Sequence, residues 1–399
     1  MSTRECETWR RFDKLINTGR ILFMKKRILA LGLAVCTVLS FVGCGKDENP
    51  TETTTAAATV NVVLEEEGKL TLPNYKGLVV YSDDVKVSEE DLQKYLNTRL
   101  EAFATTEYVK EGTLEKNMEI KISYTGTIDG KEFTGSSSPA AVAALTDKGF
   151  VINGSAVPGF ADAVIGKNVG DTVEMDLTLP KDYSVKDLQN KTAHFVVKID
   201  SIVKVVEPKL SNEYVEKEYG ELGIKTVEEF MDYLRETLYM NNVYAKVWPT
   251  IIENTTVQSY AKADYEEMFK SVSESEEQII YMNYGYTLDQ YLALLGMTQS
   301  DWDFQISEYV KGTLKEEMII EELAKVEKLE PTEEEFNRKM LEYAKSYGMS
   351  TVDELKEYYG AEDEAYWFSV RTYKVQKFVV DNATVKEGSD PNKATTAAK

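Results

Sequence analysis

The chain has 399 residues and a net charge of −22, from 46 basic and 68 acidic side chains. That length leaves room for two or three domains, each with a core of its own. The acidic balance argues against nucleic-acid binding, because contacts with phosphates need clustered Lys and Arg. The charge is also compatible with a role in solubility alone.

The one long apolar run in the sequence lies near its start, where Met24-Lys-Lys-Arg27 precedes the apolar stretch 28–42. A basic segment, an apolar segment and a small residue in this order are typical of a secretory signal. The run ends in Ser40-Phe-Val-Gly-Cys44, which resembles the lipobox of bacterial lipoproteins. An uncleaved membrane anchor is the alternative, but the run is short for a membrane span.

We therefore expect residues 1–44 to be a signal region, with Met24 as the true start. Cys44 is expected to carry a lipid that anchors the protein to the extracytoplasmic face of the cell membrane. The mature chain would keep only this one of its three Cys, so no disulfide framework is predicted. The polar, Thr- and Ala-rich stretch 45–60 predicts a flexible tether, and 388–399 a disordered tail.

Residues 61–115 are predicted to form a connecting arm, with a strand near Tyr75 followed by a helix. Ser88-Glu-Glu-Asp91 has the pattern of a capping box at the start of that helix. The apolar residues after it fall on one helical stripe: Leu92, Tyr95, Leu96, Leu100 and Phe103.

Residues 116–206 alternate apolar and polar side chains in the stretches 118–124, 173–179 and 193–199. Such alternation predicts antiparallel strands with one face on a core and the other in water. Asp129-Gly130 lies between two such runs and predicts a hairpin. A short helix is expected at 160–165. The region is thus predicted to be a small sheet wrapped on one short helix.

Four motifs follow one another in this region. They are Tyr124-Thr-Gly with Asp129-Gly-Lys-Glu-Phe133, Val157-Pro-Gly-Phe160, Ile165-Gly-Lys-Asn-Val-Gly170-Asp and Pro180-Lys-Asp-Tyr183. Together they resemble the FKBP-type peptidyl-prolyl isomerase domain. The resemblance implies a pocket for the proline of an X-Pro segment, walled by Tyr124, Phe133, Val157, Phe160 and Phe195, with Tyr183 at its rim. Residues 136–148 are expected to form a loop longer than the usual flap.

The implied reaction, prolyl cis–trans isomerisation, needs no acid, base, metal or cofactor. Its barrier comes from amide resonance. Twisting the bond removes that resonance and makes the amide less polar, so an apolar aromatic pocket favours the twisted state. The alternative is that the aromatic residues are the core of a domain that binds peptides without turnover. His194, the only His, falls on the face opposite Phe195 and is expected to be solvated.

From 207 to 387 the pattern becomes helical, which makes the predicted fold class α+β with an all-α second part. Helix-start signals recur at Thr226, Thr287, Thr298, Thr332 and Thr351. Apolar stripes follow them, as with Phe230, Leu234 and Leu238.

Leu323-Ala-Lys-Val-Glu-Lys-Leu-Glu-Pro331 and Val352-Asp-Glu-Leu-Lys-Glu-Tyr-Tyr-Gly360 resemble the C-terminal chaperone domain of bacterial trigger factor. With the arm and the isomerase region, this resemblance covers roughly 75–386 in the order of that family. A signal and lipobox stand where the family has its ribosome-docking domain. Ribosome binding is therefore not expected.

The function expected from these features is that of a lipid-anchored, extracytoplasmic peptidyl-prolyl cis–trans isomerase and folding chaperone for exported proteins. Its expected partners are unfolded or newly exported polypeptides, their X-Pro segments, and the membrane through the lipid. No nucleic acid, metal or cofactor is expected. The rival hypothesis is a non-catalytic surface lipoprotein that binds peptides or proteins through a vestigial isomerase domain.

Overall fold

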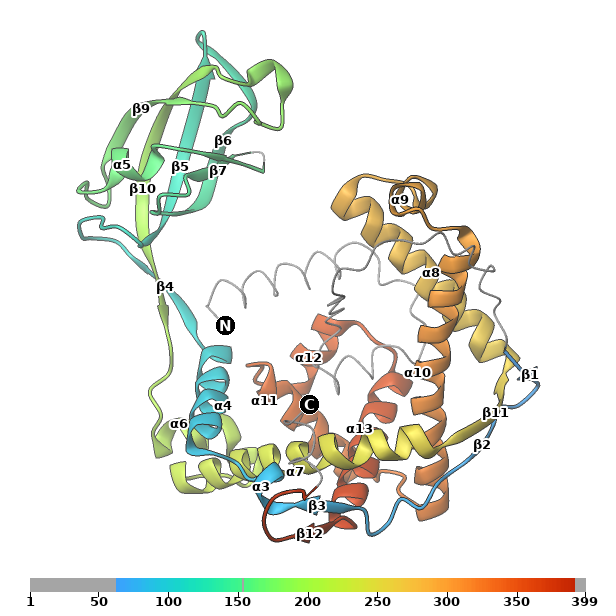
Figure 1. Cartoon of the computed structure of the whole chain (residues 1–399). Helices are drawn as coiled ribbons and strands as arrows, with labels where there is room; N and C mark the ends of the chain where they lie inside the picture. Colours follow the sequence, from blue (N-terminus) through green and yellow to red (C-terminus); the bar gives the residue numbers. More distant parts are fainter. Residues whose placement is uncertain (1–61, 153, 392–399) are drawn as a thin grey trace. The chain divides into compact units, whose positions relative to one another are not determined.

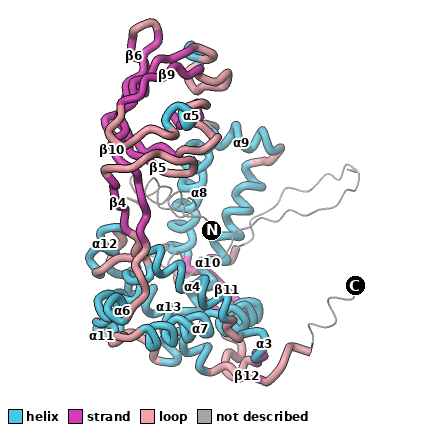
Figure 2. Tube along the Cα trace, turned by 90° about the vertical axis from the view of Figure 1, so that its left-hand side faces the viewer, coloured by secondary structure: helices cyan, strands magenta, loops and turns pink. Residues whose placement is uncertain are grey.

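The computed structural model describes residues 62–152 and 154–391. They form two compact units, one of residues 98–210 and the other of the described residues up to 97 and from 211 onward. Strands dominate the first unit and helices the second (Figure 2). The predicted signal region with Cys44, the tether 45–60 and the last part of the tail, 392–399, lie outside the described residues. In the described part of the chain, no helix is long and apolar enough to cross a membrane.

The unit of residues 98–210, the sheet unit, is built on five antiparallel strands (Figure 1). β10 (Thr192–Val206) is central and pairs along one side with β5 (Glu119–Ile128). Its other side pairs with β9 (Thr172–Thr178) and then with β4 (Thr105–Val109). β6 (Lys131–Ala144) pairs with β5 and forms the edge of the sheet. The three predicted strands are confirmed.

The hairpin predicted at Asp129-Gly130 is also confirmed, with Ile128 paired to Lys131. Both turn residues have positive φ, 50° and 75°, which matches the right-handed twist of the flanking strands. The predicted loop at 136–148 is wrong, because β6 continues as far as Ala144. Its small residues, among them the buried Ala143, gave too little apolar contrast for the alternation to be visible in the sequence.

One face of the sheet carries the core, and the short helix α5 (Phe160–Val164) packs there against β9. The hairpin of β7 (Phe150–Ile152) and β8 (Ser155–Val157) adds its side chains to the same core. A single turn, η1 (Lys186–Leu188), precedes β10.

The other unit, the helical unit, confirms the predicted helices. They are α6 (Asn212–Tyr219), η2 (Gly220–Leu222), α7 (Val227–Asn254), α8 (Lys262–Tyr284), α9 (Leu288–Leu295), α10 (Gln299–Glu327), α11 (Glu333–Ser346), α12 (Val352–Tyr359) and α13 (Asp363–Asp381). All five predicted capping boxes form, those at Thr226, Thr287, Thr298, Thr332 and Thr351. In each, the threonine side-chain oxygen accepts the backbone N–H of the residue three positions later, and the side chain of that residue accepts the backbone N–H of the threonine.

Short strands tie both ends of the described chain to this unit. β11 (Thr256–Ala261), a strand inside the region predicted to be helical, pairs with β1 (Leu64–Glu65) and β2 (Lys69–Thr71). β12 (Thr384–Lys386) pairs in parallel with β3 (Val79–Tyr81).

Ordered contacts continue into the first residues of the stretch predicted to be a disordered tail. The N–H of Gly388 donates to Ser82 Oγ, at the start of the short helix α3 (Ser82–Val85). The hydroxyl of Ser389 donates to Asp83. Residues 388 and 389 therefore form part of the folded unit.

The arm helix α4 (Glu89–Ala102) begins where the sequence predicts, because Ser88 Oγ accepts the N–H of Asp91 at 3.1 Å. Leu92 and Leu96 of the predicted stripe are buried. The boundary between the two compact units falls within this helix, between residues 97 and 98.

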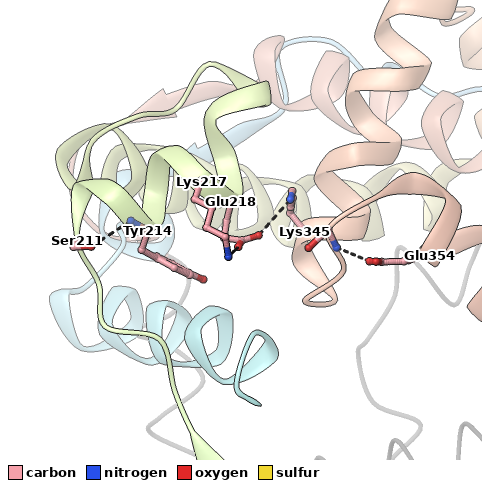
Figure 3. Close-up of polar contacts among 7 residues, drawn as sticks. Ser211, Tyr214, Lys217, Glu218, Lys345 and Glu354 are labelled. Carbon is pink, nitrogen blue, oxygen red and sulfur yellow. Dashed lines mark hydrogen bonds and ion pairs between the residues drawn. The ribbon is translucent and has the colours of Figure 1, made fainter. Parts of the chain in front are cut away.

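A buried ion pair joins α6 to α11 inside the helical unit (Figure 3). Lys345 Nζ lies 3.5 Å from Glu218 Oε2, and the two side chains are only 6% and 7% exposed. Lys217 Nζ, 2.8 Å from the other carboxylate oxygen, approaches from solvent. Without Lys345, the buried Glu218 carboxylate would keep only this solvent-facing lysine as a partner, and a buried charge that loses its buried partner is the costly case.

We expect Lys345→Met to lower the free energy of unfolding of the helical unit by about 3 kcal/mol. Tryptophan fluorescence during urea unfolding reports this unit, because residues 98–210 contain no Trp. The control is Lys325→Met, which removes an exposed ion pair with Glu322 and should cost less than about 1 kcal/mol. Equal losses in the two variants would contradict the importance of the buried pair.

Candidate active site

The structure brings all six residues of the predicted pocket together in the core of the sheet unit. They come from four strands, one helix and one loop: Tyr124 of β5, Phe133 of β6, Val157 of β8, Phe195 of β10, Phe160 of α5 and Tyr183 of the loop after β9. Tyr124 and Phe133 are half-buried, and the other four are buried. Their strand register, and not their sequence spacing, makes them neighbours.

Phe195 is the buried ring that joins Tyr124 and Phe133 in this aromatic cluster. Its centroid lies 6.1 Å from that of Tyr124 and 6.3 Å from that of Phe133, the second pair meeting edge to face at 81°. Offset and edge-to-face contacts of this kind are the favourable arrangements for aromatic pairs. The half-buried rings of Tyr124 and Phe133 therefore rest on a buried ring that fixes their positions.

Phe150 of β7 belongs to the same cluster, although the sequence analysis did not identify it. Its ring stacks on Phe160 at 4.7 Å and meets Tyr124 edge to face at 5.3 Å. The pairing of β7 with β8 sets Phe150 opposite Val157. The sequence carries little signal here, because Phe150, Val151 and Ile152 are all apolar and only the structure shows that Val151 is exposed between two buried residues. The run is also only three residues long and follows a segment read as a loop.

Two glycines allow the close packing of the cluster. A Cβ on Gly126 would lie 2.4 Å from Cε1 of Phe195, so the ring occupies the space above this part of β5. A Cβ on Gly149 would lie 2.4 Å from the carbonyl oxygen of Val157, and Gly149 also has a positive φ of 82°. Any larger residue at either position must displace the ring or the β8 backbone.

The polar groups at the border of the cluster are satisfied within it. Tyr124 Oη donates to the carbonyl oxygen of Gly135 at 3.2 Å, and the N–H of Phe133 donates to the buried Ser136 Oγ at 3.1 Å. Burial raises the pKa of Tyr124 above its usual value, so the phenol stays protonated at neutral pH and remains a donor. The cluster thus presents aromatic and aliphatic surface with phenol groups and no carboxylate.

His194 lies on the opposite face of the sheet and about half exposed, as the alternation predicts. Its Nδ1 is 2.8 Å from Asp176 Oδ1, and its Nε2 is 3.8 Å from Glu174 Oε2. The imidazole therefore takes no part in the aromatic cluster. Across residues 62–152 and 154–391, no group of His, Cys, Asp and Glu side chains is arranged to hold a metal ion.

Comparison with known proteins finds two families along the chain. Residues 110–200 match the family described as FKBP-type peptidyl-prolyl cis-trans isomerase. Residues 265–381 match the family described as bacterial trigger factor protein (TF) C-terminus. The first match contains all six predicted pocket residues, and the second covers most of the helical unit from α8 onward.

Among individual relatives, the chain is 30% identical over 311 residues to the trigger factor of Halothermothrix orenii, covering 75% of this chain and 69% of that one. It is 29% identical over 342 residues to the trigger factor of Acetivibrio thermocellus, covering 83% and 75%. Superposition on a solved structure of the trigger factor chaperone gives a TM-score of only 0.32 at 15% identity, with 79% and 73% of the two chains covered. The likeness therefore rests on the sequence matches.

We expect Gly126→Ala to push Phe195 out of place and to destabilise the sheet unit by ~1–3 kcal/mol, the usual cost of overpacking a core. Hydrogen exchange of the full chain, read by mass spectrometry, should show faster exchange in β5 and β10. The matched control is Thr125→Ala, at the next position on the exposed face of the same strand, which should leave exchange in β10 unchanged. Unaltered exchange in Gly126→Ala would mean that the ring has room to move.

Proposed function

The chain belongs to the trigger factor family, and on this premise we propose that it is a peptidyl-prolyl isomerase and folding chaperone, held by a lipid on Cys44 at the extracytoplasmic face of the cell membrane. Exported proteins would be its clients. The chain carries an FKBP-type isomerase domain and a trigger factor C-terminal domain, which support the two activities. The lipid anchor and the site of action are supported by the sequence near Cys44.

The aromatic cluster is the observation that carries the isomerase proposal. A proline that contacts Tyr124 and Phe133, the half-buried members, meets apolar rings supported from below by Phe195. Such a surface stabilises the twisted amide more than the planar one, because twisting reduces amide polarity. The backbone N–H of Val157 is expected to hydrogen-bond the bound peptide. No proton transfer is required.

A second candidate function, peptide binding without turnover, is favoured by the position of Phe150. Its ring stacks on Phe160 and lies edge-on to Tyr124, so it occupies space among the predicted pocket residues. A proline that needs this space has to displace the Phe150 ring first. Once the ring has moved, the domain catalyses isomerisation only if the opened cluster stabilises the twisted amide more than the planar one. Without that preference, the domain binds the peptide but does not isomerise it.

We expect the full chain to accelerate cis–trans isomerisation of an X-Pro tetrapeptide above the uncatalysed rate, measured without a coupled protease. Phe133→Leu should reduce kcat/KM by up to about tenfold, since an aromatic pair is worth ~0.5–1.5 kcal/mol. Tyr108→Phe, a change at an exposed residue of the same unit, is the control and should keep full activity. A wild-type rate equal to the uncatalysed one would leave the binding role as the function of this domain.

An exposed apolar patch in the helical unit supports the chaperone activity. It lies at the end of α8, in the loop that follows and in α9, and Figure 1 shows the two helices next to each other. Its members are Ile279, Tyr281, Met282, Tyr284, Tyr286, Leu294 and Leu295, with Tyr281 and Leu294 65% and 68% exposed. Residues 279–295 contain a single charged side chain, Asp289, in an otherwise highly charged chain.

Exposed apolar surface on this scale is unusual in a soluble monomer and typically marks an interaction site. The patch lies inside the stretch that matches the trigger factor C-terminus. It supports a holding role in which apolar segments of unfolded clients cover these side chains. The acidic charge on the rest of the unit would limit self-association of the patches.

The proposed anchor is tested by Cys44→Ala. In the native bacterium or a bacterial host, we expect this variant to lose incorporation of labelled fatty acid and to leave the membrane fraction, because each buried CH₂ contributes ~0.8 kcal/mol to membrane binding. Cys36→Ala, in the apolar part of the predicted signal, should be processed and retained normally. If Cys44→Ala stays bound to the membrane as firmly as the wild type, the protein is held there by something else.

A further inference from the structure

We propose that the face of the isomerase sheet opposite the aromatic cluster holds a second binding groove, which takes an extended acidic segment of a polypeptide. The groove shares only Tyr124 of β5 with the proline site, and its role does not depend on isomerase activity. It lies entirely within residues 98–210.

Two hollows make up this outer groove. The first has a volume of about 440 Å³ and is bounded by Ser123 and Thr125 of β5 and by Val196 of β10. The second, of about 470 Å³, is bounded by Lys110 and Lys121. Both are lined by Pro139 of β6 and Lys198 of β10, so they adjoin each other.

The strand register explains why the sheet is hollowed here. The groove follows β5, and each neighbour of β5 loses its regular register beside it: β6 at Pro139 and Ala140, and β10 at Asp200. An extra residue in one strand bends that strand and strengthens its twist. Two such irregularities on either side of β5 leave its outward side chains on the floor of a channel.

The length and lining of the channel suit an extended chain. From Lys121 to Thr125 the strand rises about 13 Å, enough for roughly four residues in extended conformation. Ser123 and Thr125 on the floor, and Ser137 on the wall, make no side-chain hydrogen bond with another residue of the described chain. Their hydroxyls are therefore available to a bound peptide, while Val196 and Pro139 offer apolar contact.

The charge of the groove selects for acidic residues. Lys110, Lys121 and Lys198 line it against one acidic side chain, Asp200, although the whole chain carries −22. Lys110 Nζ contacts only the backbone oxygen of Asp200, at 3.5 Å, and Lys121 Nζ lies 5.0 Å from the ring centroid of Tyr108. None of the three forms an ion pair with a carboxylate in residues 62–152 or 154–391.

The surrounding charge makes this patch distinct from the rest of the protein. Residues 98–210 contain 13 basic and 16 acidic side chains, a net charge of −3, so nearly all of the acidic excess lies elsewhere. An acidic segment would thus be repelled by most of the chain and accepted here. An anionic membrane surface shares this charge preference, but the hydroxyl-lined channel favours a single chain that enters it.

The test is fluorescence anisotropy of the full mature chain with labelled (Glu-Ser)₄ and the matched neutral peptide (Gln-Ser)₄. We expect the acidic probe to bind and the neutral one to bind at least about tenfold more weakly, with the difference shrinking as salt rises from 50 to 200 mM. The double variant Lys121→Gln/Lys198→Gln should weaken binding of the acidic probe on the order of fivefold to tenfold, since each exposed charge contributes modestly.

The control is Lys186→Gln/Lys191→Gln, which makes the same change in net charge at two exposed lysines outside the groove. It should bind the acidic probe as the wild type does, and both double variants should keep wild-type isomerase rates and circular dichroism. Equal binding of the two probes, or equal loss in the two double variants, would overturn the proposal. The proposal would also be overturned if the chain bound phosphatidylglycerol vesicles through Lys121 and Lys198 but did not bind the acidic peptide.

Discussion

The pairing of β4 with the end of β10 is the constraint around which the chain is organised. Residues 105–109 and 202–206 are the segments through which the chain enters and leaves the sheet unit, and they pair with each other in antiparallel register. Pieces of the helical unit come from both sides of this insertion, as the strand pairs β1 with β11 and β3 with β12 demonstrate. Because the segments that enter and leave the sheet unit pair with each other, one continuous chain can form both units, and each unit keeps its own core.

The two activities make opposite demands on apolar surface. The isomerase proposal needs aromatic rings held in fixed positions, and Gly126 and Gly149 provide the close packing that fixes them. The chaperone proposal needs apolar side chains left uncovered, as in the stretch 279–295. A single core could not satisfy both demands, because packing that positions rings also buries them. Placing the two surfaces in separate units resolves this conflict.

Local signals in the sequence were sufficient for much of the fold. The Asp129-Gly130 turn and the five threonine capping boxes depend on neighbouring residues alone, and all of them form as predicted. The strand β11 was missed because six residues between two long helices carry little periodicity, and its partners lie almost 200 positions earlier. The continuation of β6 was missed because alanines replace the larger side chains that make alternation visible.

The candidate site shows the same limit. Motif resemblance placed six residues together, but nothing in the sequence indicates that Phe150 stacks on Phe160 or that Phe195 fills the space over Gly126. The outer groove was also hidden, since it depends on bulges in two strands that are far apart in sequence. Packing against distant partners decides such features, and short-range patterns do not encode it.

The central claim is that isomerase and chaperone activities reside in separate units. The most direct measurement removes residues 103–210, joins Ala102 to Ser211 through a flexible Gly/Ser linker, and compares suppression of aggregation of an unfolded client with that of the whole chain. The account predicts that suppression persists while acceleration of X-Pro isomerisation is lost. Loss of suppression with the helices intact by circular dichroism would contradict it, and would assign the holding function to the isomerase domain.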